Sequence, residues 1–600
     1  MGDRLRDLST MVRVSWRADR VRSVGALVTS AAVSLTWSIG AVGLAWLTDG
    51  VSRGERSRAV AGVVFVAVIV AGQHVLEWAN QTLRMRLREH TILYIDQRVM
   101  SLVGGLPGLE HHERADYQDR MDLLRRQRGS LANPFMPLAW TVAGIVQVGT
   151  SVALLARLHP LMLLLPAAAI PSVWATLRAE SMWKKLHEEQ AEDERRLRHL
   201  FELATLPDAA KEVRLFGLGD ELAERHRRTF EAMERRRMAA SIRSGALRAG
   251  GWACFGLAFL VVIAFLARRA VEGSASAGDV VLTLSLGAFL NGQLSGLVYN
   301  SGWISRTAQA VSRYRWLEEH AAEAHAAVAT PDPARLPPRV GQGLDLQGVG
   351  FRYPGTDDPV LSDVDLHLPA GSTVAIVGEN GAGKTTLVKL LLRFYEPTEG
   401  TVRLDGVDLR RFDVDEWRAR TSASFQDFAR LQFIARQSVG VGLLADLDRE
   451  PAVVAALERG GAGDLAGSLP RQLDTQLGRD FDGGVDLSTG QWQKVALGRT
   501  MMRDTPLLLV LDEPTASLDA PTEHALFERY ASQARAAGGR TGAVTVLVSH
   551  RFSTVRMAEL IVVLEGGRVT EVGGHDELMA RHGRYAELYA LQARGYSACE

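Results

Sequence analysis

Cysteine is almost absent from this 600-residue chain, which holds only Cys254 and Cys599. One lies in an apolar run and the other at the tail, so the sequence supports neither a disulfide framework nor a cysteine-based metal site. An excess of charge of either sign is also missing, because 69 Lys and Arg balance 69 Asp and Glu. A general nucleic-acid-binding protein needs a basic face, so this balance argues against that class.

The apolar residues, 47% of the chain, are unevenly distributed. The first half alternates long apolar runs with arginine-rich segments, whereas the second half has the mixed composition of a soluble α/β domain. The length is sufficient for several domains. The sequence therefore predicts a membrane part followed by a soluble part.

Residues 1–22 are rich in arginine and precede an apolar run that is too long for a secretory signal. Further runs come close to the ~20 residues that a bilayer requires. We predict an all-α transmembrane domain over residues 1–320, with helices at about 24–47, 59–80, 135–156, 158–177, 246–267 and 280–303. Basic residues after the second, fourth and sixth helices favour cytoplasmic termini. Arg53, Arg56 and Arg58, between the first and second helices, would lie on the outer side, against the positive-inside tendency.

Several polar side chains fall within or beside these apolar runs, where contact with lipid is costly. They are Gln73, His74, Glu77, Gln147, Asn291, Gln293, Tyr299 and Asn300. Such residues face a cavity or another helix, and the pattern alone does not separate substrate contact from helix–helix hydrogen bonding.

A short polar segment, Glu110-His111-His112-Glu113, has the residue types of a metal site. Adjacent histidines seldom give good zinc geometry without further ligands spaced on one face. We therefore predict a solvated loop here.

The most informative stretch is Gly378-Glu379-Asn380-Gly381-Ala382-Gly383-Lys384-Thr385-Thr386. An apolar run before it predicts a buried strand, and another after it predicts a helix. A glycine-rich turn in this context directs backbone N–H groups at a polyphosphate, and the helix N-terminus adds a favourable dipole. The residues expected to hold the nucleotide are Gly378, Asn380, Gly381, Ala382, Gly383, Lys384, Thr385 and Thr386. Lys384 would reach the β- and γ-phosphates, and the Thr385 hydroxyl would ligate Mg²⁺.

A second pattern follows at Leu487-Ser488-Thr489-Gly490-Gln491, and an apolar run ending in Asp512 and Glu513 comes about twenty residues later. This run predicts a buried strand that delivers Asp512 to Mg²⁺. Glu513 is then placed beside it as general base for the attacking water.

These motifs, in this order, resemble the nucleotide-binding domain of the ATP-binding cassette (ABC) family over residues 344–595. The resemblance implies that Tyr353 stacks on adenine, with a core tyrosine as the competing interpretation. It also implies that Gln426 reaches Mg²⁺ and the attacking water, and that His550 holds the γ-phosphate.

The same resemblance implies a site shared between two subunits. Ser488, Thr489, Gly490 and Gln491 would face the γ-phosphate held by the opposite subunit, and Asp519 would lie at the dimer interface. Thr489 departs from the family pattern, which has glycine at this position. Threonine adds a β-branched side chain where glycine would leave room. We therefore expect it to affect how strongly ATP closes the two ATPase domains, but not the fold.

The fold class that follows is multidomain: a six-helix transmembrane domain, a proline-containing linker at 321–343, and an α/β P-loop ATPase domain at 344–600. The long polar stretches 82–133 and 178–244 mix charged and apolar residues at helical spacing. They are similar to the cytoplasmic extensions of ABC exporters. Within them, segments 113–120 and 211–216 resemble coupling helices that touch the ATPase domains.

One membrane part and one ATPase part make half a transporter, so the resemblance implies a dimer, either of two copies or with a differing partner. The expected function is ATP- and Mg²⁺-dependent export across a bacterial cytoplasmic membrane, with a peptide or amphipathic natural product as substrate. The alternatives are lipid or multidrug export and, with less support, a non-transport regulator gated by ATP. A soluble cassette ATPase would lack the apolar runs. The absence of a domain ahead of Val24 leads us to expect no attached cysteine peptidase.

Overall fold

The computed structural model describes residues 2–513, 532, 535–549 and 551–597. The chain divides into two compact units. The first, called here the helical unit, comprises Met1–Gly104 and Arg120–Glu319. The second, the sheet unit, comprises Gly105–Asp119 and His320–Glu600.

Helices account for nearly all of the helical unit, and two of them, α5 and α13, continue into the sheet unit. The bounds are α1 (Gly2–Ala18), α2 (Arg20–Ser52), α3 (Arg56–Gly104), α5 (Ala115–Arg126), α6 (Arg128–Leu131), α7 (Met136–Leu158), the 3₁₀ helix η1 (Pro160–Leu163), α8 (Leu164–Ala168), α9 (Ile170–Glu189), α10 (Ala191–Thr205), α11 (Ala210–Leu215), α12 (Gly219–Val271) and α13 (Ala277–Val328).

Six helical segments of the described chain are long and apolar enough to cross a membrane, and each overlaps one predicted span, with starts that differ by one or two residues for the third and fourth. The fourth segment, Pro160–Glu189, is not a single α-helix, since η1 and α8 precede α9. Pro160, Pro166 and Pro171 lie in this part of the chain. Proline has no amide hydrogen to donate, which interrupts the regular hydrogen bonding of a helix. The six-helix prediction is confirmed, and the prolines account for the irregular fourth segment.

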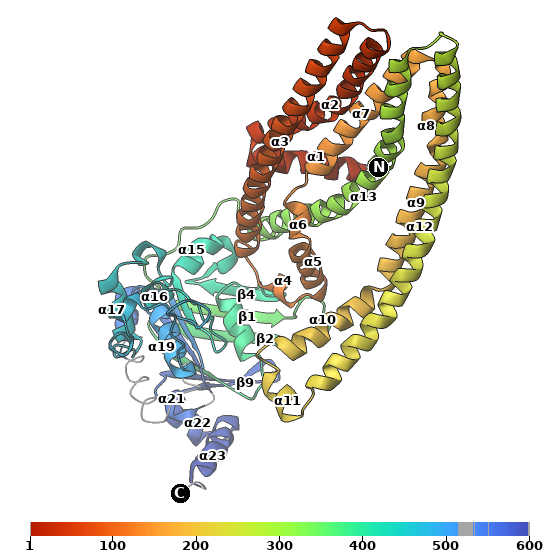
Figure 1. The fold of residues 1–600 in the computed structure, drawn as a ribbon. Helices are drawn as coiled ribbons and strands as arrows, with labels where there is room; N and C mark the ends of the chain where they lie inside the picture. The colour runs from red at the N-terminus through yellow and green to blue at the C-terminus, as the bar shows by residue number, and fades with distance from the viewer. Residues whose placement is uncertain (1, 514–531, 533–534, 550, 598–600) are drawn as a thin grey trace. The chain divides into compact units, whose positions relative to one another are not determined.

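Three of the helices extend well beyond their apolar runs. The helix α12 has 53 residues, which at 1.5 Å per residue is about 80 Å, far more than the ~30 Å hydrocarbon core of a bilayer. Its polar half runs alongside α9 and α10 (Figure 1). There Arg237 donates to Glu194 at 2.6 Å and to Gln190 at 3.0 Å. The stretches predicted to be helical extensions are helical.

Small residues allow α2 and α3 to pack closely. A Cβ at Gly50 would lie 2.4 Å from the Ala59 backbone nitrogen, and one at Gly62 would lie 2.6 Å from that of Leu47. Membrane helices associate largely through such close backbone approach, because lipid supplies no hydrophobic drive between them. A separate contact joins α2 to α13. Asp49, near the end of α2, accepts through Oδ1 a 2.7 Å hydrogen bond from the backbone N–H of Gly278.

The sheet unit contains two sheets. The four-stranded sheet is antiparallel with order β2-β1-β4-β5, and the six-stranded sheet has order β10-β9-β3-β8-β7-β6. In the larger sheet only β10 is antiparallel to its neighbour. The strands are β1 (Gly343–Phe351), β2 (Leu361–Pro369), β3 (Thr373–Val377), β4 (Glu399–Leu404), β5 (Val407–Asp408), β6 (Thr421–Ser424), β7 (Leu508–Asp512), β8 (Val544–Val548), β9 (Leu560–Glu565) and β10 (Arg568–Gly573).

Helices and 3₁₀ turns flank both sheets. They are α4 (Glu110–Glu113), α14 (Lys384–Leu391), η2 (Leu409–Arg411), α15 (Val414–Ala419), α16 (Ala435–Gly440), η3 (Leu444–Asp446), α17 (Glu450–Arg459), α18 (Leu465–Ser468), η4 (Gln472–Asp474), α19 (Thr489–Thr500), α21 (Phe552–Val555), α22 (His575–Ala580) and α23 (Arg584–Ser597).

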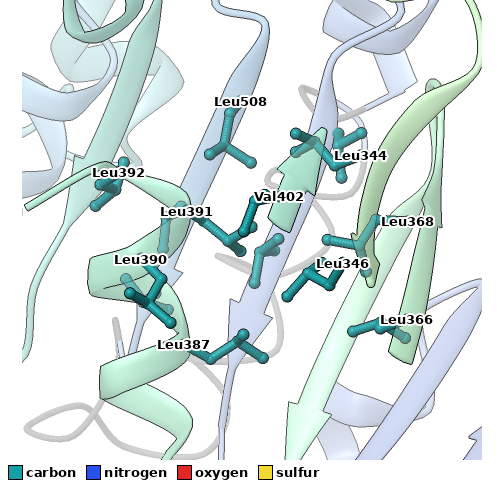
Figure 2. Packing of buried hydrophobic residues seen from close by; sticks show 14 of the residues in the cluster. Leu344, Leu346, Leu366, Leu368, Leu387, Leu390, Leu391, Leu392, Val402 and Leu508 are labelled. Carbon is teal, nitrogen blue, oxygen red and sulfur yellow. The ribbon is translucent and has the colours of Figure 1, made fainter. Parts of the chain in front are cut away.

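The main core of the sheet unit lies around α14 and joins both sheets (Figure 2). Leu387 and Leu391 of α14 meet Leu344 and Leu346 of β1 and Leu508 of β7 in this cluster. The strand β3 is buried at all five positions, as expected for a parallel strand covered on both faces. This core holds the start of α14 in place, directly after the phosphate loop.

The connection between the two predicted domains is partly helical. The helix α13 runs to Val328, so the first residues of the predicted 321–343 linker are not a linker. The remainder is fastened to the sheet unit by hydrogen bonds, including Thr330 Oγ1 to Arg410 O at 2.8 Å and Val340 N to Thr541 O at 2.7 Å. The prolines therefore lie along a folded surface rather than in a free spacer.

Candidate nucleotide-binding site

The phosphate loop occupies the turn between β3 and α14. Gly378 has φ +157° and a Cβ there would lie 2.2 Å from Leu564 O; Gly383 has φ +100° and caps α14. Only glycine combines these conformations with such close backbone approach. The predicted strand, turn and helix are all present, so backbone N–H groups of the loop and the helix N-terminus lie where a phosphate chain would bind.

Lys384, the first residue of α14, folds back over the loop. Its Nζ donates to Gly378 O at 2.9 Å and to Glu379 O at 2.8 Å. Burial lowers the pKa of Lys384, while the nearby carboxylates of Glu513 and Asp512 act in the opposite direction. The ammonium group is thus already at the loop, held by carbonyls that a phosphate can replace.

Asp512 lies at the carboxyl end of β7 and is 4% exposed. Burial, reinforced by the charge of Glu513, raises the pKa of Asp512 to about 6, although a hydrogen bond from Thr385 favours the ionised form. A buried carboxylate with a raised pKa next to a hydroxyl provides two hard oxygen ligands of the kind that a divalent cation prefers.

Glu513 follows Asp512 with φ +46°, an unusual conformation for a residue with a side chain. Its backbone N–H donates to Val548 O at 2.9 Å, which holds the turn. Gln426, from the loop after β6, donates from Nε2 to Glu513 Oε2 at 2.8 Å. Strained backbone of this kind costs about 1–3 kcal/mol and clusters at functional sites. The structure therefore brings together the predicted base and the predicted glutamine.

The donor set fits Mg²⁺. The Thr385 hydroxyl, the Asp512 carboxylate and the Gln426 amide oxygen are the ligand types that this cation prefers. Because Asp512 is buried and its pKa is raised, a divalent cation at this point would relieve an unfavourable charge.

Tyr353, the predicted adenine-stacking residue, is half-buried at the edge of the core. Its hydroxyl lies 3.0 Å from Thr386 Oγ1, and its ring makes edge contacts with Phe351 and Tyr395. Lys389 Nζ lies 5.2 Å from the ring centre. Both proposed roles for this tyrosine, core packing and ring stacking, are compatible with these contacts.

The segment Glu110–Glu113 is the short helix α4 rather than the predicted loop, although Glu110, His112 and Glu113 are exposed as a solvated segment requires. His111 is 5% exposed and packs against Tyr117, with the ring centres 5.1 Å apart. Glu113 accepts hydrogen bonds from Lys389 at 2.8 Å and from the Tyr395 hydroxyl. The cause is tertiary packing, because the partners of Glu113 come from the sheet unit far along the chain.

The signature segment begins α19. Ser488 is its N-cap: Ser488 Oγ accepts from Gln491 N at 3.2 Å, and Gln491 Oε1 accepts from Ser488 N at 2.9 Å. This reciprocal pair satisfies two backbone donors at the helix start. Thr489 is exposed and Gly490 half-buried, so the threonine methyl is accommodated without contact strain inside the chain.

The remaining predicted site residues are placed as follows. Asn380 and Gly381 are exposed on the phosphate loop, Ala382 is packed in the core, and Thr385 and Thr386 lie in the first turn of α14. The predictions for Asp519 and His550 lie outside the described residues.

The helical unit contains two adjoining cavities, of about 520 and 320 Å³. Some of the polar residues predicted to face a cavity or another helix line these cavities, and others do not. Gln147 and Gln293 line both cavities, Gln73 lines the larger and Asn300 the smaller. In contrast, Tyr299 is 56% exposed and Asn291 is fully buried. Sequence reasoning missed Arg84, which lines the smaller cavity and which the charge pattern assigned to a cytoplasmic flank.

Comparison with known proteins agrees with this site. The family model described as ABC transporter matches residues 361–516, which include the phosphate loop, the signature segment and the end of β7. The fold of the chain is that of a bacterial Atm1-family ABC exporter solved with ATP bound, with a TM-score of 0.73, 24% identity and coverage of 96% of this chain and 99% of that one. Residues 361–516 are thus similar to an ABC transporter nucleotide-binding domain, and the chain as a whole has the fold of an ABC exporter, with six described helical segments long and apolar enough to cross a membrane ahead of that domain.

Two curated relatives carry the same description. The ATP-dependent lipid A-core flippase of Pseudomonas aeruginosa is 34% identical over 322 residues, which is 54% of this chain and 50% of that protein. The protein of that name from Chromohalobacter salexigens is 40% identical over 259 residues, covering 43% of this chain and 42% of the relative. The chain thus spans about half the length, or less, of these curated relatives.

Proposed function

We propose that this protein is an ATP-driven exporter that works as a dimer of half-transporters in a bacterial cytoplasmic membrane. The observation that carries the proposal is the pairing of two features in one chain. Six helical segments among the described residues are long and apolar enough to span a bilayer, and Glu513, Gln426, Asp512 and Lys384 converge around one phosphate loop.

In the proposed mechanism, the phosphate loop and Lys384 bind the β- and γ-phosphates of ATP. Lys384 exchanges its two carbonyl contacts for phosphate oxygens. Mg²⁺, held by Thr385, Asp512 and Gln426, would neutralise charge on the phosphates. Glu513, oriented by its hydrogen bond from Gln426, accepts the proton of the attacking water. His550 holds the γ-phosphate in this proposal, and the products are ADP and phosphate.

The dimer is proposed from the signature segment and from α11. Ser488 and the N-terminus of α19 offer donors to a phosphate held by a second chain. At the end of α11, Leu215 and Phe216 are 78% and 66% exposed. Two neighbouring apolar side chains in open solvent favour burial against a partner. ATP can then drive the membrane helices only if it binds the closed pair more tightly than the open one.

For the substrate, the similarity to lipid A-core flippases favours the lipid alternative over peptide export. We therefore propose a lipid or a lipid-like amphiphile, and retain peptides and drugs as competitors. The apolar cavity in the helical unit is consistent with a hydrocarbon-bearing substrate.

The test places the purified protein in vesicles and measures ATP hydrolysis and the movement of labelled lipids, dyes and peptides across the bilayer. We expect hydrolysis-dependent movement of a lipid and stimulation of hydrolysis by the same lipid. Movement of every label at the rate seen with Glu513→Gln would contradict the exporter proposal. Movement of a peptide alone would restore the peptide alternative.

A further inference from the structure

We propose that the helical unit holds a binding site for an anionic amphiphile, in which Arg84 binds the acidic group and the adjoining cavity holds the hydrocarbon part. This inference rests on the proposed export function and specifies the chemistry of what is exported. It starts from the two cavities, which share Trp37, Gln147 and Gln293 as lining residues and therefore lie next to each other.

The two cavities differ in chemistry. The larger is lined mainly by apolar groups such as Leu44, Ile69 and Phe289, and no charged side chain of the described chain lines it. The smaller is bordered by the amides of Asn80 and Asn300, and its one charged lining residue among those described is Arg84. The combined space thus has an apolar end and a polar end of positive charge.

Arg84 is placed to bind an anion. Its guanidinium lies over the Trp140 ring at 5.0 Å. Its Nε is buried and makes no hydrogen bond to any described residue. The side chain is half-buried, and an unpartnered buried donor on a cation is costly, whereas a charge-assisted hydrogen bond to a phosphate or carboxylate would satisfy it. The indole positions the group without neutralising it.

The spread of the lining residues along α3 fits an amphiphile rather than a small anion. Val66 lines the apolar end and Arg84 the polar end, both on α3. Eighteen residues at 1.5 Å each separate them by about 27 Å along the helix. A free phosphate would use only the polar end and leave the apolar cavity unfilled, so a molecule with both parts is favoured.

The test measures binding without nucleotide, so that its failure leaves the ATPase proposal untouched. The full-length protein is placed in nanodiscs of phosphatidylcholine, which carries no net charge, and titrated calorimetrically with dodecyl phosphate, dodecanoate or dodecyl maltoside. Empty nanodiscs correct for partition into lipid. The variants are Arg84→Gln, Arg84→Lys and, as a matched control, Arg88→Gln, which changes an exposed arginine one turn along the same helix.

We expect Arg84→Gln to weaken dodecyl phosphate binding by roughly tenfold or more, as loss of a charged hydrogen-bond donor does. Arg84→Lys should retain much of the affinity, Arg88→Gln should match the wild type, and dodecyl maltoside should not distinguish the variants. If the wild type binds dodecanoate more weakly than dodecyl phosphate, the site binds a phosphate group. If it binds the two with equal affinity, the site is a general anion site. Equal affinity of wild type and Arg84→Gln for dodecyl phosphate, or an equal loss in Arg88→Gln, would overturn the proposal.

Discussion

Lys389 Nζ lies 2.8 Å from Glu113 Oε1 and so joins the helix that begins at the phosphate loop to the segment 105–119. The same ammonium lies 3.4 Å from the Tyr353 hydroxyl. Burial opposes the charge of Lys389, but the hydrogen bonds and charges of Glu113 and Tyr353 together outweigh it and raise the pKa of the lysine. One cation thus contacts both the proposed adenine-stacking residue and a residue of the predicted coupling segment.

We expect Glu113→Gln to raise the KM for ATP by roughly twofold to fivefold, the effect of a partly exposed ion pair, with a smaller change in kcat. The reason is that Lys389 loses its charged partner and no longer holds the Tyr353 side chain firmly. ATP titrations of the hydrolysis rate would measure this. Glu110→Gln removes a neighbouring exposed carboxylate and serves as control. An unchanged KM in Glu113→Gln, or an equal rise in the control, would refute this role.

Glu513→Gln should lower kcat for ATP hydrolysis by roughly 10²- to 10⁴-fold, the usual contribution of a general base. ATP should still bind, because the phosphate loop is unaltered and glutamine preserves the shape of the side chain. A rapid-quench assay combined with nucleotide-binding measurements would separate the two effects. Glu399→Gln, on an exposed position of the smaller sheet, should hydrolyse ATP at the wild-type rate. Substantial hydrolysis by the Glu513 variant would mean that another group takes the proton.

Gly378→Ala should lower the melting temperature and prevent ATP binding. An alanine Cβ would meet Leu564 O at 2.2 Å on backbone already at positive φ. Gly355 also has positive φ, +84°, but a Cβ there meets nothing within 4 Å. Gly355→Ala is therefore the matched control for conformational strain, and we expect Gly378→Ala to cost at least about 1 kcal/mol more. Equal melting temperatures for the two variants would show that the loop adapts.

His111 should make the stability of the sheet unit depend on pH. Burial, together with the neighbouring His112 and His320, lowers the pKa of His111 to about 4 from its usual 6.5. Between these values the unfolded chain binds the proton and the folded chain does not, so stability falls as the pH falls from 6.5 to about 4. Thermal unfolding across this range should show a flatter profile for His111→Phe than for wild type. His199→Phe, at an exposed position, should retain the wild-type slope; an unchanged slope in His111→Phe would contradict the assignment.

The features that sequence predicted well are local. The apolar run at 373–377, the glycines after it and the apolar run that follows specify strand, loop and helix, and apolar runs of sufficient length specify the six membrane helices. The features it missed depend on distant residues. The resemblance to a coupling helix predicted that segment 113–120 touches the ATPase domain, but Glu113 and Lys389 are 276 positions apart, so the sequence did not indicate which residue binds Glu113.

Arg84 illustrates the same limit in the helical unit. Beside other arginines it is typical of a cytoplasmic flank, and only packing places it over Trp140 at the edge of a cavity. The contact between Gln426 and Glu513 and the positive φ of Glu513 are likewise products of tertiary structure. Motif spacing predicted which residues belong to the site, whereas their contacts required the fold.

The central claim is that each ATP is bound by the phosphate loop of one chain and the signature segment of another. The direct measurement mixes Lys384→Ala and Ser488→Ala chains, each of which should be inactive alone. If the site is shared, mixed dimers contain one intact site, and hydrolysis should recover to as much as about a quarter of the wild-type rate. If each chain hydrolysed ATP by itself, mixing would restore nothing, and that result would contradict the account.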